Sequence, residues 1–210
     1  KFLEITGRKK PYIIEQPMPM DKNLISRIKT TVPNKIIFLD LVVDQQEDIL
    51  KKIRSFADIL IVDHHQITKN LNNKTIVHFN PRFTDSKMYT SATYNVYKIC
   101  SELVDMKDYI WLAAVGIISD YAMEDSKDVV DEIKKKYSLE GDLYKSFLGR
   151  MTDMIFSARA TKDFNCEQMV EMFLRVVDPR RLDGLEGFDR LIRCYHLVNE
   201  EIDAIMADAR

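Results

Sequence analysis

Three places in the chain carry side chains that together could hold a metal ion. Asp40 and the triplet Asp63-His64-His65 each follow a short apolar run, and Asp120 follows a longer one. Mixed carboxylate and imidazole ligands suit manganese, iron or zinc, and a carboxylate can bridge two ions about 3.5 to 4 Å apart. Two such ions can activate water and neutralise the oxygens of a phosphoryl transfer. The sequence therefore predicts a metal site built from these three places.

Each of these residues also has an ordinary structural interpretation. A solvated strand end or a helix cap explains Asp40 alone about as well, and Asp120 alone fits a loop residue after a buried helix. Two adjacent imidazoles after a buried run are harder to explain structurally, because core histidines usually occur singly and need partners. We interpret His78, inside a strand pattern, as structural, and His196, on an amphipathic helix, as structural or surface. The histidine pair is therefore the strongest signal.

A parallel sheet is needed to bring these residues together. Short apolar runs rich in β-branched residues alternate with segments of helical spacing, which predicts parallel strands covered by helices. Ligand sites in such folds lie at the carboxyl ends of the strands. The expected strands are 11–16, 35–40, 58–62 and 75–79, and the expected helices between them are 21–31 and 45–56.

The rest of the chain has helical patterns. Ser91 or Thr90 can cap the first of these helices, and Gly116 inside an apolar helix indicates close packing. A charge-rich segment, 124–141, marks the expected boundary between an α/β domain, 1–125, and a helical region, 126–210. The expected helices are 91–104, 108–119, 127–137, 143–160, 166–177 and 185–208.

Bulk properties restrict the class of protein. The chain has 210 residues, 46% hydrophobic and 30% charged, so it can form a sizeable core and is not a disordered chain. A net charge of -2 argues against binding nucleic acid by bulk charge, although a local basic groove is compatible. Cys100, Cys166 and Cys194 are far apart and predict reduced thiols in a cytoplasmic protein. No run of apolar residues is long enough for a membrane span, and no export signal is recognisable, so we expect neither a membrane span nor secretion.

Taken together, the motifs resemble those of the DHH phosphoesterase superfamily. The resemblance covers residues 11–122 and rests on Asp40, the Asp63-His64-His65 triplet and the A-V-G-I-I-S-D run that ends at Asp120. The family has a lone Asp at a strand end, the namesake triplet after the next strand, and an Asp after a Gly-containing apolar helix. The order and spacing here agree. The resemblance implies an α/β fold with a parallel sheet flanked by helices, followed here by an all-helical C-terminal region.

The resemblance also implies a role for each residue. Asp40 would bridge two Mn²⁺ ions, with Mg²⁺ as an alternative ion, and His64 and Asp120 would complete the ligands of one of them. His65 would face the substrate phosphate. Asp63 would orient or support the histidines.

The chain departs from the family in two ways. The family's first motif, of the His-x-Asp-x-Asp type, would supply ligands of the other metal, and nothing from Lys1 to Met20 resembles it. We expect that motif and its strand to lie upstream of Lys1, or to have been lost by evolution, and expect weak or no activity from residues 1–210 alone. The DHHA1 substrate domain is also absent, with helices in its place. The Asn80-Pro81 turn resembles the family's strand-end loop, but the sequence assigns it no chemistry.

Three functions are compatible with these features. The favoured hypothesis is a manganese-dependent phosphoesterase of the RecJ-like, archaeal-type branch, an exonuclease acting on single-stranded DNA, RNA or oligonucleotides, with a replication or repair protein as a further partner. The first alternative is a non-catalytic RecJ-related scaffold in a replisome. The second is a small-molecule phosphatase or pyrophosphatase. Retention of Asp40, His64, His65 and Asp120 favours an enzyme, because a scaffold has no chemical need for them.

Overall fold

The computed structural model describes residues 1–16, 18–21, 23–161 and 166–208, except for the side chain of Cys166. Its sheet has three parallel strands, β1 (Lys35–Leu39), β2 (Asp58–Val62) and β3 (Ile76–Phe79), in the order β1-β2-β3. Parallel pairing places the carboxyl ends of all three strands at one edge. The expected parallel sheet flanked by helices and followed by a helical region is confirmed.

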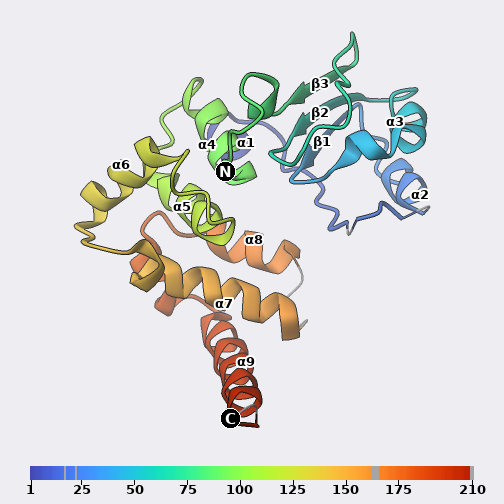
Figure 1. The fold of residues 1–210 in the computed structure, drawn as a ribbon. Helices are drawn as coiled ribbons and strands as arrows, with labels where there is room; N and C mark the ends of the chain where they lie inside the picture. Colours follow the sequence, from blue (N-terminus) through green and yellow to red (C-terminus); the bar gives the residue numbers. More distant parts are fainter. Residues whose placement is uncertain (17, 22, 162–165, 209–210) are drawn as a thin grey trace.

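Along the chain, some helices of the described residues come before or between the strands and the others follow them (Figure 1). Phe2 of the first helix packs against the core of the later helices. The first group is α1 (Phe2–Ile5), α2 (Leu24–Lys29) and α3 (Glu47–Ile53). The second is α4 (Ala92–Ser101), α5 (Ile110–Ser119), α6 (Lys127–Tyr137), α7 (Phe147–Thr161), α8 (Cys166–Leu174) and α9 (Phe188–Asp208).

One face of the sheet is buried under α2 and α3. Successive strand residues point to opposite faces, so alternate positions of β1, β2 and β3 enter the same core. That core comprises Met20, Leu24, Ile28, Phe38, Val43, Leu50, Ile53, Ile59, Ile61, Leu71 and Ile76. On the opposite face, the apolar side chains of Ile37, Leu39, Val77 and Phe79 remain exposed. Helix α4 contacts β2 and connects the sheet to the helical part.

The helical part is organised around α5, which is apolar on nearly every side. Ile110, Trp111 and Ile117 of this helix are fully buried, and α4, α6 and α7 pack against it. Helix α9 packs along α7 and extends beyond the rest of the molecule in Figure 1. The core around α5 includes residues on both sides of position 125. The division into 1–125 and 126–210 stays a prediction.

The strand expected at 11–16 is wrong. These residues form no strand in the structure, and Ile14 packs against the core under the sheet while Tyr12 is exposed. The run is apolar enough for a strand, but Pro11 has no N–H to donate to a ladder. None of the described helices is both long and apolar enough to cross a membrane. The interpretation of Cys166 as a buried thiol falls on a side chain outside the described residues.

His78 is buried in β3, as its strand pattern predicted. Its ring lies edge-on to Phe83, with the ring centroids 5.0 Å apart, and its Nδ1 has no hydrogen-bond partner among the described residues. Burial lowers the pKa of His78, and the charges of Asp44 and Asp63 only partly oppose this. The folded protein therefore holds this imidazole in its neutral form.

This burial predicts a loss of stability in mild acid. Below the unfolded pKa of about 6.5, the unfolded chain binds a proton at His78 that the folded chain does not. The stability that His78 contributes is therefore present above that pH and is lost as the pH falls toward the lowered folded pKa. In urea titrations at pH 7.5 and 5.0, the wild type should lose more free energy of unfolding than His78→Leu. An equal loss in both proteins would contradict the prediction.

Candidate metal centre

Two neighbouring strands deliver Asp40 and Asp63 to the same edge of the sheet. Leu39 pairs with Val62, so the residues that follow them leave the sheet side by side. The backbone N–H of Asp40 donates to the carbonyl of Val62 at 3.1 Å, and that of Asp63 to the carbonyl of Phe79 at 3.1 Å. Asp40 has a φ of 60°, a left-handed conformation that aspartate tolerates better than most residues. The hydrogen bonds between the strands and this turn together fix the backbone positions of Asp40 and Asp63.

The five side chains selected from the sequence meet at this edge. Ligand atoms of Asp40, Asp63, His64 and His65 all lie within 4.8 Å of one another. His64 Nε2 is 3.1 Å from Asp40 Oδ1 and 3.7 Å from Asp120 Oδ2, so it lies between two carboxylates. His65 Nδ1 is 2.7 Å from Asp63 Oδ1. Asp120 reaches the group from the end of α5.

The two histidines differ in their access to solvent. The side chain of His64 is 7% exposed and that of Asp63 is 5% exposed, whereas His65 is 42% exposed. His64 therefore faces inward to the carboxylates, and His65 presents its ring to the outside while Asp63 orients it. The separate roles that the resemblance implies for the two imidazoles stay predictions.

The electrostatics of the cluster centre on His64. Burial disfavours its charged form, yet the hydrogen bond to Asp40 and the charge of Asp120 outweigh burial and raise the pKa of His64. The same hydrogen bond lowers the pKa of Asp40, although burial opposes the change. Burial raises the pKa of Asp120; His64 opposes this and Asp40 reinforces it. The carboxylates thus compete for one positive charge.

The residues present fit a divalent cation. Among the residues that the structure describes, no lysine or arginine forms an ion pair with Asp40, Asp63 or Asp120. Converging carboxylates without a fixed cation repel one another, and a bound metal ion removes that repulsion. Carboxylate oxygens with an imidazole nitrogen form a donor set suited to manganese. The side chains whose ligand atoms all lie close together are Asp40, Asp63, His64 and His65, and Asp120 adds a carboxylate 3.7 Å from His64. The ligand set Asp40, His64 and Asp120 stays a prediction.

The backbone of the triplet is held by three side chains from the segment that follows β3. Asn95 Nδ2 donates to the carbonyl of Asp63 at 3.5 Å, Arg82 Nε to that of His64 at 2.9 Å, and Asn80 Nδ2 to that of His65 at 3.0 Å. Three consecutive carbonyls are thus each fixed by a different donor, which restrains the direction of the histidine rings. We call Asn80, Arg82 and Asn95 the carbonyl clamp.

The clamp residues are themselves anchored. Asn80 caps the short 3-10 helix η2 (Pro81–Phe83) by accepting from the backbone N–H of Arg82 at 3.0 Å, and Arg82 Nη1 donates to the carbonyl of Ser86 at 2.7 Å. Asn95 accepts from Thr90 Oγ1 at 3.0 Å. Sequence reasoning singled out only the Asn80-Pro81 turn and missed Arg82 and Asn95, because nothing in their spacing shows that they reach back to the triplet.

Loss of a clamp side chain should weaken metal binding without removing a ligand. In metal sites, changing a group that orients a ligand typically costs 10- to 100-fold in affinity, so we expect Asn80→Ala to lower Mn²⁺ affinity about 10-fold. Isothermal titration with Mn²⁺ measures the effect. Asn199→Ala on α9 removes another amide that donates to a backbone carbonyl and serves as the control. Equal affinities for the two variants would contradict the clamp.

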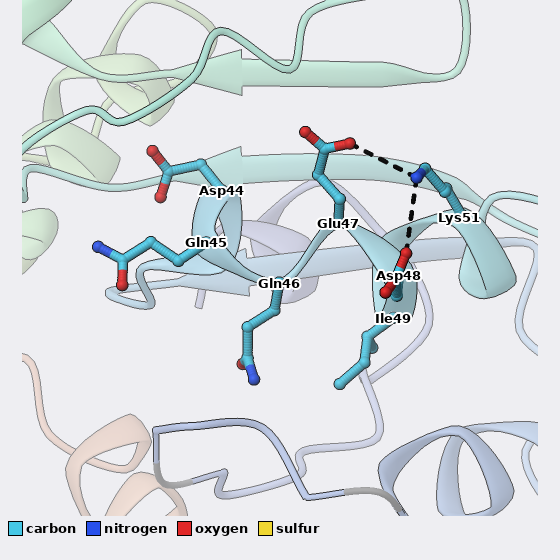
Figure 2. A pocket seen from close by; sticks show the side chains of 7 residues that line it. All are labelled: Asp44, Gln45, Gln46, Glu47, Asp48, Ile49 and Lys51. Carbon is cyan, nitrogen blue, oxygen red and sulfur yellow. Dashed lines mark ion pairs between the residues drawn. The ribbon is translucent and has the colours of Figure 1, made fainter.

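A surface pocket lies on a different part of the protein. It is lined by residues 44–49 and 51, which run from the turn after β1 into α3 (Figure 2). Its charges are already paired, because Lys51 Nζ lies 3.7 Å from Glu47 Oε2 and 3.5 Å from Asp48 Oδ1, and Glu47 also pairs with Lys69. Asp44 accepts hydrogen bonds from Thr68 and anchors the loop after the triplet. This pocket is interpreted as structural.

The architecture was compared with known proteins. No protein-family profile and no curated protein matches the chain. Among solved structures, the chain is similar to the crystal structure of exonuclease RecJ bound to manganese, with a TM-score of 0.67 and 17% sequence identity. The chain has a RecJ-like fold. The match covers 99% of this chain and 59% of the RecJ chain, so the chain spans less than two thirds of that structure.

Proposed function

We propose that this protein is a metal-dependent phosphoesterase of the RecJ-like type that cleaves phosphodiester bonds in single-stranded nucleic acid or oligonucleotides. One observation carries the proposal: His64 lies between the carboxylates of Asp40 and Asp120, at the strand ends of a RecJ-like fold. The manganese in the similar RecJ structure supports Mn²⁺ as the ion. The archaeal-type branch, the cytoplasmic location and a replication or repair partner remain parts of this proposal.

Each side chain has a task in this function. Asp40, His64 and Asp120 would hold an ion, which when bound supplies positive charge and an acidified water molecule to the reaction. His65 is the exposed imidazole of the cluster, and its Nδ1 faces the Asp63 carboxylate. When the ring carries both protons, Nε2 can donate a hydrogen bond to a phosphate oxygen, which would stabilise the charge that develops during cleavage. Asp63 fixes the direction of that ring through its 2.7 Å contact with Nδ1.

The non-catalytic scaffold is less well supported. A scaffold would have no chemical use for a nearly buried imidazole between two carboxylates and next to a second, exposed imidazole. The carbonyl clamp restrains the backbone of the same residues, which an ion-binding site requires and a scaffold does not. The arrangement is that of a site built to bind.

The test is hydrolysis of labelled single-stranded DNA and RNA by the natural full-length protein. We expect mononucleotide release that depends on Mn²⁺, stops with EDTA and falls at least ~100-fold in His64→Ala. A pyrophosphate substrate, measured alongside, separates the small-molecule phosphatase from the nuclease. Equal rates for the wild type and His64→Ala would refute the proposal.

A further inference from the structure

Three exposed tyrosines lie near the metal centre. Tyr121 directly follows Asp120 and is 76% exposed, and its ring centroid lies 5.3 Å from that of Tyr144 at an interplanar angle of 30°. The ring centroid of Tyr89 lies 6.0 Å from that of His64. Tyr89 and Tyr144 are also exposed. Large aromatic rings are thus gathered beside a site whose own ligands are small and polar.

The backbone of Tyr121 ends helix α5. Its φ is 55°, its N–H donates to the carbonyl of Ile118 at 3.2 Å, and the N–H of Ala122 donates to that of Ile117 at 2.9 Å, a common left-handed helix ending. This turn explains the backbone of Tyr121. Core packing does not require its aromatic ring, which is 76% exposed beside a proposed metal ligand.

Tyr89 is fixed on the same side of the site. Its backbone N–H donates to Asp125 Oδ2 at 2.6 Å, which ties this loop to the segment that begins at Tyr121. The guanidinium carbon of Arg82 lies 5.9 Å from the ring centroid of Tyr89, while Arg82 Nε holds the carbonyl of His64. The guanidinium of Arg82 therefore contacts both the ring of Tyr89 and the backbone of the metal centre.

Printed contacts connect the three rings through the metal centre. Tyr144 packs on Tyr121, which follows Asp120 in the chain, and Tyr89 lies against His64. Asp120 Oδ2 and His64 Nε2 are 3.7 Å apart, so both sets of rings adjoin the same site.

We propose that Tyr89, Tyr121 and Tyr144 form a stacking platform for the bases of a single-stranded nucleic acid whose phosphodiester lies at the metal centre. This rests on the proposed phosphoesterase function. Base-on-aromatic stacking is the means by which proteins hold single strands without reading sequence, because every base has a π-face. Arg82 adds a positive charge for a phosphate and a planar group beside Tyr89.

The test compares two ligands of the same length, a fluorescein-labelled oligo-dT and an abasic oligonucleotide that keeps the phosphates but lacks the bases. Fluorescence anisotropy with residues 1–210 in EDTA measures binding without turnover. We expect the wild type to bind oligo-dT more tightly than the abasic strand. The double variant Tyr121→Leu with Tyr144→Leu should lose about 10-fold in oligo-dT affinity and nothing in abasic affinity.

Two further variants protect this test from misfolding. Tyr121→Phe keeps the ring and should keep the affinity, and Tyr195→Leu on α9 removes a tyrosine away from the sheet and should change neither ligand. Equal wild-type affinities for the two strands, or equal losses for both strands in the double variant, would overturn the platform.

The binding test and the phosphoesterase assay can fail independently of each other. Base-dependent binding that tyrosine removal abolishes, together with no Mn²⁺-dependent hydrolysis, would support the platform and refute the enzyme. Base-independent binding, together with equal hydrolysis of oligo-dT and abasic strands, would refute the platform and leave the enzyme.

Discussion

His64→Ala is expected to lower the affinity of residues 1–210 for Mn²⁺ by ~100-fold or more, since it removes a ligand and not merely a group that orients one. The imidazole Nε2 lies 3.1 Å from Asp40 and 3.7 Å from Asp120, so its loss leaves two carboxylates without the nitrogen between them. The electron paramagnetic resonance signal of free Mn²⁺, followed during titration with protein, measures the affinity directly and needs no enzymatic activity.

His196 offers a matched control for this experiment. It is an exposed histidine on α9, outside the metal centre, so His196→Ala removes an imidazole without touching the proposed ligands. Its Mn²⁺ affinity should equal that of the wild type. If both variants bind Mn²⁺ as the wild type does, the cluster is not the metal site, and the proposed function loses the observation on which it rests.

Gly116→Ala is expected to destabilise the fold by about 1–3 kcal/mol, the usual range for overpacking a close contact. A Cβ at Gly116 would lie 1.8 Å from Thr93 Oγ1 and 2.8 Å from Thr93 Cβ, so a rotation of the threonine side chain cannot relieve the clash. Thr93 is held at the start of α4, where Ser91 caps the helix and contacts Thr93 Oγ1 at 3.0 Å. Helix α5 must therefore move away from α4.

That movement should also reach the metal centre, because Asp120 follows the last residue of α5. We expect a weaker Mn²⁺ affinity in addition to the lower free energy of unfolding in urea. Gly184→Ala is the matched control, since a Cβ there meets no atom within 4 Å and should change stability by less than about 0.5 kcal/mol. Equal free energies of unfolding for the two variants would show that α4 and α5 can separate without a loss of stability.

Local patterns predicted most of the elements well. Residues 127–137 were expected to be helical and form α6 with the same bounds, and Ser91 caps α4 by accepting from the backbone N–H of Tyr94. These features depend on periodicity and on residues next to one another, which the chain itself specifies. The segment 11–16 failed because its apolar run satisfies a strand pattern, whereas forming a strand requires a pairing edge that no local pattern provides.

The sequence by itself determined which side chains follow the buried apolar strands and the apolar helix. Asp40, the histidine pair and Asp120 were selected from it alone, since strand ends are marked by the abrupt change from apolar to polar residues.

Only the tertiary structure decided how these side chains meet. It placed His64 inward and His65 outward, turned Asn80, Arg82 and Asn95 back onto the triplet, and brought Tyr89 against His64 and Tyr144 against Tyr121. The physical reason is that such contacts join residues far apart in the chain. Their distances depend on how loops close and helices pack, and no periodicity within a single segment records that.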